Sequence, residues 1–169
     1  MFIFRSRTMP VSESATGLRI GHFNVYHSFN KVADVSFLLN QSSQLTYLFG
    51  ISDTRLGSRT DSNSVRIPDY CVMRRDSSQT LHTGIALYVH QSIAVSTRRR
   101  TDLESEGVEC VLVEINDLKS RSLLVGRNPA SPTTWFDDFI QMIDKANDHK
   151  SSILLIGDFD NGLCKPQPA

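Results

Sequence analysis

Apolar residues come in short runs separated by polar and turn-forming residues, and the spacing within these runs changes along the chain. Residues 18–24 and 45–51 are apolar and rich in β-prone types, so we predict a strand over each. Between them, apolar residues recur mostly at helical spacing over 29–40, which predicts a helix that ends at Asn40. Residues 56–64 follow as a predicted loop.

The middle of the chain contains further strand-like runs, each followed by polar or turn residues. They cover residues 70–74, 84–89, 93–97, 108–115 and 121–125. Between the last two, Asn116-Asp117 predicts a turn.

The last part of the chain combines one amphipathic helix with one apolar strand. Pro132 starts the predicted helix, and Asp137 and Asp138 in its first turn favour the helix dipole. Residues 152–157 form a final apolar strand. Strand, helix, several strands, helix and strand in this order predict a mixed α/β fold with a substantial antiparallel part.

Composition narrows the class of protein. A chain of 169 residues with 40% hydrophobic and 21% charged residues is typical of one globular domain and excludes collagen-like, coiled-coil and disordered classes. No apolar run approaches the roughly 18 residues of a membrane span, and no signal peptide precedes the domain. Three cysteines without a CxxC pair favour a reduced intracellular compartment. From these features together, we expect neither membrane insertion nor secretion.

Charge is balanced overall but not along the chain. Residues 1–100 contain 12 Lys and Arg against 6 Asp and Glu, a net +6, and residues 101–169 contain 6 against 12, a net −6. A basic part beside an acidic part suits a surface for a polyanion next to an acidic pocket. Chance segregation of surface charge explains the same numbers, and the charge alone does not decide between them.

Three predicted strands end in oxygen-bearing side chains: Asn24, then Ser52 and Asp53, then Asp158 and Asp160. If these strands are neighbours, an amide and several carboxylates meet at one edge, which suits Mg²⁺ and phosphoester chemistry. Each residue also has a plainer interpretation, because Asn and Asp commonly stop strands, cap turns and form Asx turns.

Several blocks of this chain, in order over residues 18–163, resemble the endonuclease/exonuclease/phosphatase superfamily, and more narrowly the endonuclease domain of non-LTR retrotransposons. The blocks are His22-Phe23-Asn24-Val25, Phe49-Gly50-Ile51-Ser52-Asp53-Thr54-Arg55-Leu56, Thr83-Gly84-Ile85-Ala86-Leu87-Tyr88-Val89, Arg127-Asn128-Pro129-Ala130, Trp135-Phe136-Asp137-Asp138-Phe139 and residues 153–160. The resemblance divides the chain into a tail over 1–17, a partial domain over 18–163 and a tail over 164–169.

The resemblance implies a four-layered α/β sandwich that cleaves phosphodiesters with Mg²⁺, or with Mn²⁺ in its place. In retroelements this activity nicks target DNA, which places the work in the nucleus. By position, Asn24 and Asp53 would bind the metal, and Asp158 would orient or deprotonate the attacking water. Asp160 would lie at the phosphate, and Arg127 beside the scissile strand.

The chain departs from the family pattern at several places. Asp53 replaces a glutamate, Asp160 replaces an asparagine whose amide donates to a phosphate oxygen, and the tyrosine before Arg127 is absent. The closing Asp and Ser-Asp-His block, which carries the family histidine, is missing. We therefore expect a sandwich that is incomplete at the C-terminus, an activity that is weak or absent, and self-association through the exposed edge of the strand at 152–157.

Two other functions stay open from the sequence. One is a non-catalytic remnant that binds nucleic acid through Arg74, Arg75 and residues 98–100, although the last run also fits a solvated strand end. The other is a phosphatase of the same superfamily that acts on a phosphoinositide or another small phosphate ester.

Overall fold

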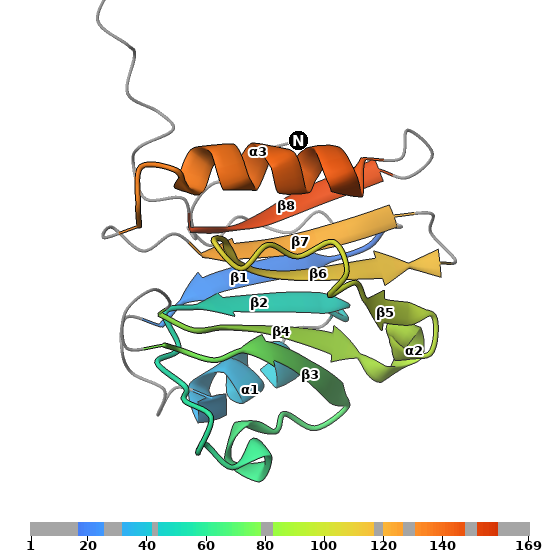
Figure 1. Cartoon of the computed structure of the whole chain (residues 1–169). Coiled ribbons are helices and arrows are strands. Elements are labelled where there is room, and N and C mark those ends of the chain that lie inside the picture. The colour runs from blue at the N-terminus through green and yellow to red at the C-terminus, as the bar shows by residue number, and fades with distance from the viewer. Residues whose placement is uncertain are drawn as a thin grey trace, which may run out of the picture.

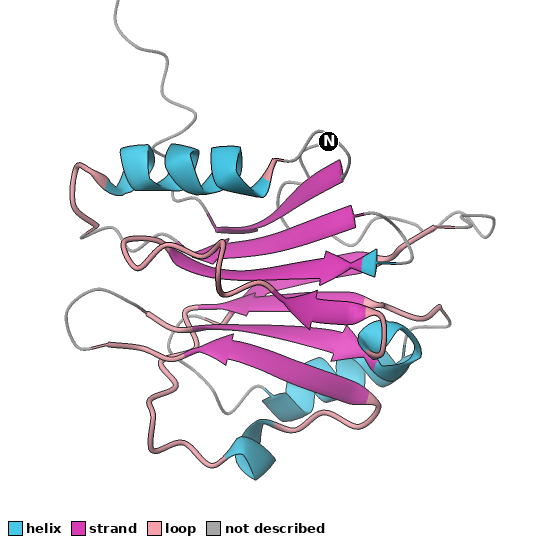
Figure 2. Cartoon of the chain, turned by 45° about the vertical axis from the view of Figure 1, so that its right-hand side comes forward, coloured by secondary structure: helices cyan, strands magenta, loops and turns pink. Residues whose placement is uncertain are grey.

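The structure is a computed structural model that describes residues 17–25, 32–41, 44–78, 83–116, 120–126, 131–147 and 152–158. Within these ranges, two four-stranded sheets pack face to face. One helix, α3, covers the outer side of one sheet, and α1 covers the outer side of the other (Figure 1). Figure 2 shows the strands gathered between these two helices.

The first sheet has the strand order β1-β2-β4-β3. Its strands are β1 (Ile20–Asn24), β2 (Leu48–Ser52), β4 (Ile85–His90) and β3 (Tyr70–Arg75). β1 and β2 run parallel, because the helix α1 (Val32–Gln41) forms the crossover between them, whereas β4 is antiparallel to both of its neighbours.

The second sheet has the strand order β5-β6-β7-β8. Its strands are β5 (Thr97–Arg99), β6 (Glu109–Ile115), β7 (Ser120–Gly126) and β8 (Ser152–Asp158). β7 and β8 run parallel and are joined through the helix α3 (Trp135–Ala146), while β5, β6 and β7 are antiparallel to one another. Each sheet thus combines one parallel pair with an antiparallel part, which confirms the mixed topology expected from the order of elements.

Three apolar clusters fill the three spaces between the four layers, because side chains alternate between the two faces of each strand. Cores between sheets and helices of this kind need both faces of a strand to be apolar. Between α1 and the first sheet lie Val35, Ile51 and Tyr88; between the sheets lie Leu48, Ile85, Leu87, Val111, Leu124 and Ile156; under α3 lie Cys110, Leu112, Leu123, Trp135 and Phe139.

The strand predicted over residues 93–97 is wrong. The structure has a short helix there, α2 (Gln91–Ala94), and the neighbouring strand β5 begins only at Thr97. Side chains explain the difference: His90 caps the helix by accepting from the Ser92 amide at 3.2 Å, and the Thr97 hydroxyl donates to the Ile93 carbonyl at 2.6 Å. Such local hydrogen bonds compete with strand pairing and override the β-prone composition.

The predicted loop over 56–64 also contains regular structure at its end. The 3-10 helix η2 (Ser62–Val65) begins there, with the Asp61 carboxylate accepting from the Asn63 amide at 3.0 Å. A helix cap formed by Asp can be predicted from a sequence only when the residues that follow it are known to be helical.

In the part of the chain that the structure describes, β1 and β3 are the edge strands of the first sheet, and β5 and β8 are the edge strands of the second. The exposed edge predicted for the strand at 152–157 thus corresponds to β8, and self-association through this edge stays a prediction. No helix in the described ranges is both long and apolar enough to cross a bilayer. The predicted tails fall outside the described residues except for Gly17.

Candidate functional site

The carboxyl ends of four strands meet at one end of the sandwich, which we call the rim. The rim is formed by Asn24, Ser52, Gly126 and Asp158, the last residues of β1, β2, β7 and β8. Asn24 is the register partner of Ser52, and Gly126 is the register partner of Asp158. Because both sheets contribute parallel pairs, the polar residues that follow their apolar strands are brought to the same edge.

A direct contact joins the two sheets at the rim. The Asn24 side-chain amide donates from Nδ2 to Oδ2 of Asp158 over 2.5 Å, between residues that are 134 positions apart in the chain. A hydrogen bond to a carboxylate is stronger than one between neutral groups. The contact fixes how the two side chains face each other, and it brings together two of the strand ends at which the sequence places oxygen-bearing side chains.

His22 comes two residues before Asn24 in β1, so the two side chains lie on the same face of the strand. Its Nε2 is 3.2 Å from Oγ of the buried Ser52, with which it forms a hydrogen bond. Burial lowers the pKa of His22 to about 4, against the opposing effect of the Asp158 charge. The imidazole is therefore neutral at pH 7 and lies beside the Asn24–Asp158 pair as an uncharged polar group.

Asp53 follows β2 directly and adopts a left-handed backbone conformation, with φ of 57°. Its Oδ1 accepts from Nε of Arg55 at 2.9 Å, and Arg55 is itself left-handed, with φ of 54°. Two such residues within three positions require support from the surrounding structure. That support comes from the start of β4, because the Thr54 amide donates to the Gly84 carbonyl at 2.9 Å.

These side chains fit the donor set that Mg²⁺ prefers. Asn24, Asp53 and Asp158 offer an amide oxygen and two carboxylates, all hard oxygen ligands, and Mg²⁺ often takes only one or two carboxylates together with substrate phosphate. In the described ranges, no cluster of three or more His, Cys, Asp and Glu side chains is arranged to hold a metal. A donor set of this kind is one that Mg²⁺ can share with a substrate phosphate.

Two of the predicted site residues, Arg127 and Asp160, lie outside the described residues. The nearest described residues before them, Gly126 and Asp158, are register partners at the rim. The roles assigned to Arg127 and Asp160 from the resemblance stay predictions.

Arg74 and Arg75, predicted to contact nucleic acid, both interact with their own chain. Arg74 pairs through Nε with Asp76 at 3.1 Å and donates through Nη2 to the Thr60 carbonyl at 2.9 Å. Arg75 donates to three carbonyl groups in residues 105–108, at 2.9, 2.9 and 3.1 Å. These contacts tie β3 to its surroundings, and DNA contact by either guanidinium stays a prediction.

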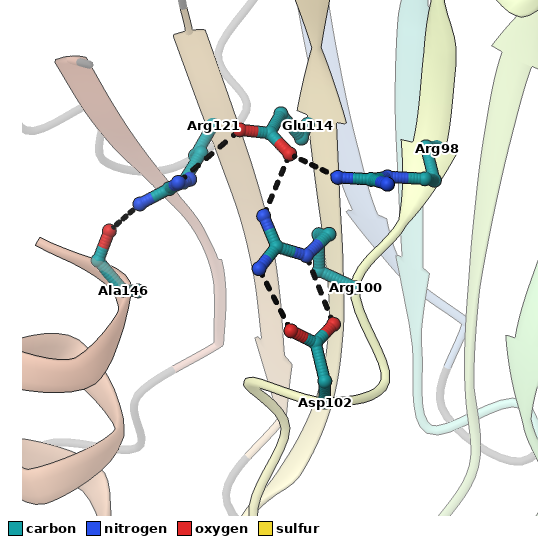
Figure 3. A network of polar contacts seen from close by, with 6 residues as sticks. All are labelled: Arg98, Arg100, Asp102, Glu114, Arg121 and Ala146. Carbon is teal, nitrogen blue, oxygen red and sulfur yellow. Dashed lines mark hydrogen bonds and ion pairs between the residues drawn. The ribbon is translucent and has the colours of Figure 1, made fainter. Parts of the chain in front are cut away.

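Three arginines converge on Glu114 at the end of the second sheet away from the rim (Figure 3). Oε2 of Glu114 accepts from Arg100 at 2.7 Å and from Arg98 at 3.0 Å, and Oε1 accepts from Arg121 at 3.1 Å. Arg121 also donates to the Ala146 carbonyl at the end of α3. The hydrogen bond from Arg100 is the main cause that lowers the pKa of Glu114, against the opposing effect of burial.

The run at 98–100 is therefore paired with acids of this chain. Arg100 also forms two hydrogen bonds with Asp102, at 2.9 and 2.7 Å, and Arg99 forms two with Glu104, at 2.9 and 2.8 Å. Bidentate pairs of this kind have a fixed geometry. They leave this run more suited to joining strands than to binding phosphates.

We expect Glu114→Gln to lower the stability of the domain by about 2 kcal/mol, since the change leaves three guanidinium groups around a neutral amide. At this chain length the melting temperature should fall by about 4–8 °C at pH 7. Because the folded-state pKa of Glu114 is lowered, its contribution is present above its ordinary value of 4.5 and is lost as the pH falls through the folded-state value. Melts of both proteins over a pH series check this, and the difference between them should shrink in acid.

Asp102→Asn is the matched control in the same cluster, because Asp102 is 61% exposed and pairs with Arg100 alone. Solvent screens an exposed pair of this kind, so this variant should melt within about 3 °C of the wild type. Equal melting temperatures for the two variants would contradict a central role of Glu114.

Sequence reasoning missed several polar residues near the rim. His22 and Ser52 were not singled out as site residues, although period-2 alternation puts His22 on the same face as Asn24. Glu109 was also missed, although a buried acid at the start of an otherwise apolar strand is unusual enough to signal a specific partner.

No family model matches the sequence, and no curated protein matches it either. One solved structure that resembles the fold is the 3′ phosphatase NExo from Neisseria, bound to a product DNA hairpin. The TM-score is 0.60 at 15% sequence identity, and the match covers 85% of this chain and 58% of that chain. The chain thus spans little more than half the length of this structural neighbour.

This likeness concerns the fold. A two-sheet sandwich with outer helices, similar in fold to this phosphatase, confirms the layered α/β sandwich predicted from the sequence. The family level of the prediction, a non-LTR retrotransposon endonuclease, stays a prediction.

Proposed function

We propose that this chain is a divalent-metal-dependent phosphodiesterase that nicks DNA and descends from a retrotransposon endonuclease. The observation that carries the proposal is the contact between Asn24 and Asp158, which joins the two sheets at the rim by a 2.5 Å hydrogen bond. The ends of β1 and β8 carry Asn24 and Asp158, for which the family resemblance implied a metal ligand and the residue that orients or deprotonates the attacking water. A structural neighbour that is a 3′ phosphatase bound to DNA supports phosphoester chemistry.

In this proposal, each of the site residues predicted from the sequence has a separate task. Asn24 and Asp53 hold Mg²⁺, or Mn²⁺ in its place, and Asp158 orients the attacking water and accepts its proton. Asp160 lies by the phosphate and Arg127 by the scissile strand. When bound, the metal stabilises the charge that develops on the reacting phosphate and the leaving oxygen.

The Asn24–Asp158 hydrogen bond supports the role of Asp158. The Asn24 amide donates to Oδ2 of Asp158 and so fixes the direction in which this carboxylate faces the rim. The adjacent His22 is uncharged at pH 7, because burial lowers its pKa to about 4.

We expect the activity to be low. Asp53 is one methylene shorter than the glutamate of the family pattern, and misplacement of a catalytic group by about 1 Å can cost about a hundredfold in rate. Asp160 replaces the asparagine of the family pattern, whose amide donates to a phosphate oxygen. An ionised carboxylate cannot donate that hydrogen bond.

DNA is the proposed substrate, with the nucleus as the proposed place of action. Arg127, Arg74 and Arg75 are the proposed contacts to the DNA backbone. Affinity that depends on phosphate neutralisation falls steeply as salt rises, whereas turnover of a small phosphate ester does not. The salt dependence therefore separates the DNA-directed function from the phosphatase alternatives.

The test is nicking of supercoiled plasmid by the purified chain with Mg²⁺, with Mn²⁺ and with EDTA. We expect slow conversion of supercoiled to open-circular DNA with either metal and none with EDTA. A hairpin oligonucleotide that carries a 3′-phosphate is assayed in parallel, because the structural neighbour is a 3′ phosphatase solved with a DNA hairpin. Release of phosphate from the hairpin without nicking would replace the endonuclease by a DNA 3′ phosphatase.

Two results would contradict the proposal. Neither cleavage nor phosphate release by protein with a cooperative melt would favour a non-catalytic remnant, and DNA binding that weakens with salt would then identify it as a nucleic-acid-binding one. Cleavage that persists in EDTA would rule out the metal-dependent mechanism.

A further inference from the structure

Glu109 is a buried acidic residue that connects the two sheets beside the rim. It is 2% exposed and begins β6, in the sheet that carries Asp158. Its two carboxylate oxygens accept from the other side of the sandwich: Oε2 from the Thr83 hydroxyl at 3.0 Å, and Oε1 from the Gly84 amide. A buried carboxylate requires such partners, because an unpaired one is very costly.

Thr83 and Gly84, which donate to Glu109, also accept hydrogen bonds from the turn after β2. The Gly84 carbonyl accepts from the Thr54 amide at 2.9 Å, and the Thr83 carbonyl accepts from the Arg55 amide at 2.7 Å. The peptide groups next to Asp53 are thus tied to the segment 83–84. One continuous series of hydrogen bonds leads from Glu109 to the backbone that carries Asp53.

The packing along this series is too close to absorb a shift. Gly84 has φ of +92°, and a Cβ built on it would lie 2.5 Å from Oγ1 of Thr54 and 3.3 Å from the Arg55 amide nitrogen. Thr54 is completely buried. A displacement of the segment 83–84 must therefore move the turn that carries Asp53.

The Glu109 carboxylate also lies close to the strand end beside Asp158. A Cβ built on Gly126 would lie 3.1 Å from Oε2 of Glu109, and Gly126 is the register partner of both Glu109 and Asp158. The same carboxylate thus occupies the space beside the end of β7 next to Asp158 and binds the segment that supports Asp53.

We propose that Glu109 is a positioning residue that fixes the Asp53 turn of the first sheet relative to Asp158 of the second sheet. The importance of this spacing for metal binding rests on the proposed function. Glu109 lies in the described core and acts through Thr83 and Gly84. Both carboxylate oxygens of Glu109 accept hydrogen bonds from this segment. Its role is therefore to hold in place the turn that carries Asp53.

The test uses two variants, Glu109→Gln and Thr83→Val, with Tyr88→Phe as the matched control. Tyr88→Phe also removes one buried hydrogen bond from β4, that of the Tyr88 hydroxyl to the Val65 carbonyl at 2.7 Å, but does not touch the Asp53 turn. Amide hydrogen exchange is measured at Thr54 and Arg55, and the dissociation constant for Mn²⁺ is measured by water proton relaxation.

We expect exchange at Thr54 and Arg55 to rise at least about tenfold in both variants, because their acceptors lose a fixed position. The dissociation constant for Mn²⁺ should rise by about tenfold as well, on the order expected for loss of an ordered ligand. Tyr88→Phe should change neither quantity, although its melting temperature falls to a similar extent. A generally structural role of Glu109 would move the melting temperature without this local pattern.

Unchanged exchange at Thr54 and Arg55 in the folded Thr83→Val variant would overturn the inference, even if Glu109→Gln failed to fold. Increased exchange with an unchanged Mn²⁺ constant would overturn the link between the turn and the metal. A wild-type chain that binds no Mn²⁺ would instead contradict the proposed function, and the exchange data would still decide the role of Glu109 in placing the turn.

Discussion

Asp158→Asn is expected to lower the rate of metal-dependent DNA nicking by about a thousandfold, because it removes the proton acceptor and leaves the shape of the rim intact. The asparagine oxygen can still accept from the Asn24 amide, which now lies 2.5 Å from Oδ2 of Asp158. General base catalysis contributes typically 10²–10⁴-fold, and a neutral amide cannot perform it. The measurement is the rate of open-circle formation from supercoiled plasmid with Mg²⁺.

Asp61→Asn is the matched control for this change. Asp61 caps the 3-10 helix η2 by accepting from the Asn63 amide at 3.0 Å, and Asn is an equally good cap. The control should therefore nick DNA at the wild-type rate, and a loss of activity confined to Asp158→Asn then excludes a contaminating nuclease as its source. Equal rates in wild-type and Asp158→Asn protein, with equal melting temperatures, would remove Asp158 from the mechanism.

Most of the fold follows from the period of apolar residues. Strands with apolar residues on both faces need cover on both sides, and two such sheets with two helices give four layers. The apolar pattern predicted the wrong element near residue 93. The β-prone residues there form the helix α2, because the His90 and Thr97 side chains form hydrogen bonds with its backbone. Period alone does not show these contacts.

The site was predictable in part because strand ends can be found in a sequence. The sequence shows that Asn24 and Asp158 each follow an apolar run, but not that β1 and β8 end at the same edge of facing sheets. That follows from the topology, in which each strand is parallel to its neighbour and the sheets pack face to face. The resemblance to a known family supplied this information where the pattern could not.

Long-range polar partners were not predictable. Arg75 was expected to contact nucleic acid, yet it donates to carbonyl groups 30 to 33 positions away. Glu109 binds Thr83 from 26 positions away, and neither residue type nor spacing indicates this pair. Charges in a sequence mark surfaces well, whereas the few charges that enter the core have partners set by the tertiary structure.

Gly157→Ala is expected to destabilise the domain by at least about 4 kcal/mol, among the largest effects of a single methyl group. Gly157 immediately precedes Asp158, has φ of +153°, and a Cβ built on it would lie 1.9 Å from the Val125 carbonyl oxygen and 2.9 Å from its carbon. Val125 is its register partner in the neighbouring strand β7 and is completely buried. The Val125 backbone occupies the space that the methyl group needs, so β8 must separate from β7 or adopt a strained conformation.

This loss is a large part of the 5–15 kcal/mol that stabilises a typical domain, so the melting temperature should fall by more than about 8 °C. Gly57→Ala is the matched control, since a Cβ there has no atom within 4 Å and the backbone has an ordinary φ. That variant should melt within about 2 °C of the wild type or slightly above it, because alanine restricts the unfolded chain. Equal melting temperatures for the two variants would mean that β7 and β8 are not paired in this register. The position of Asp158 at the rim, which depends on that pairing, would then also be wrong.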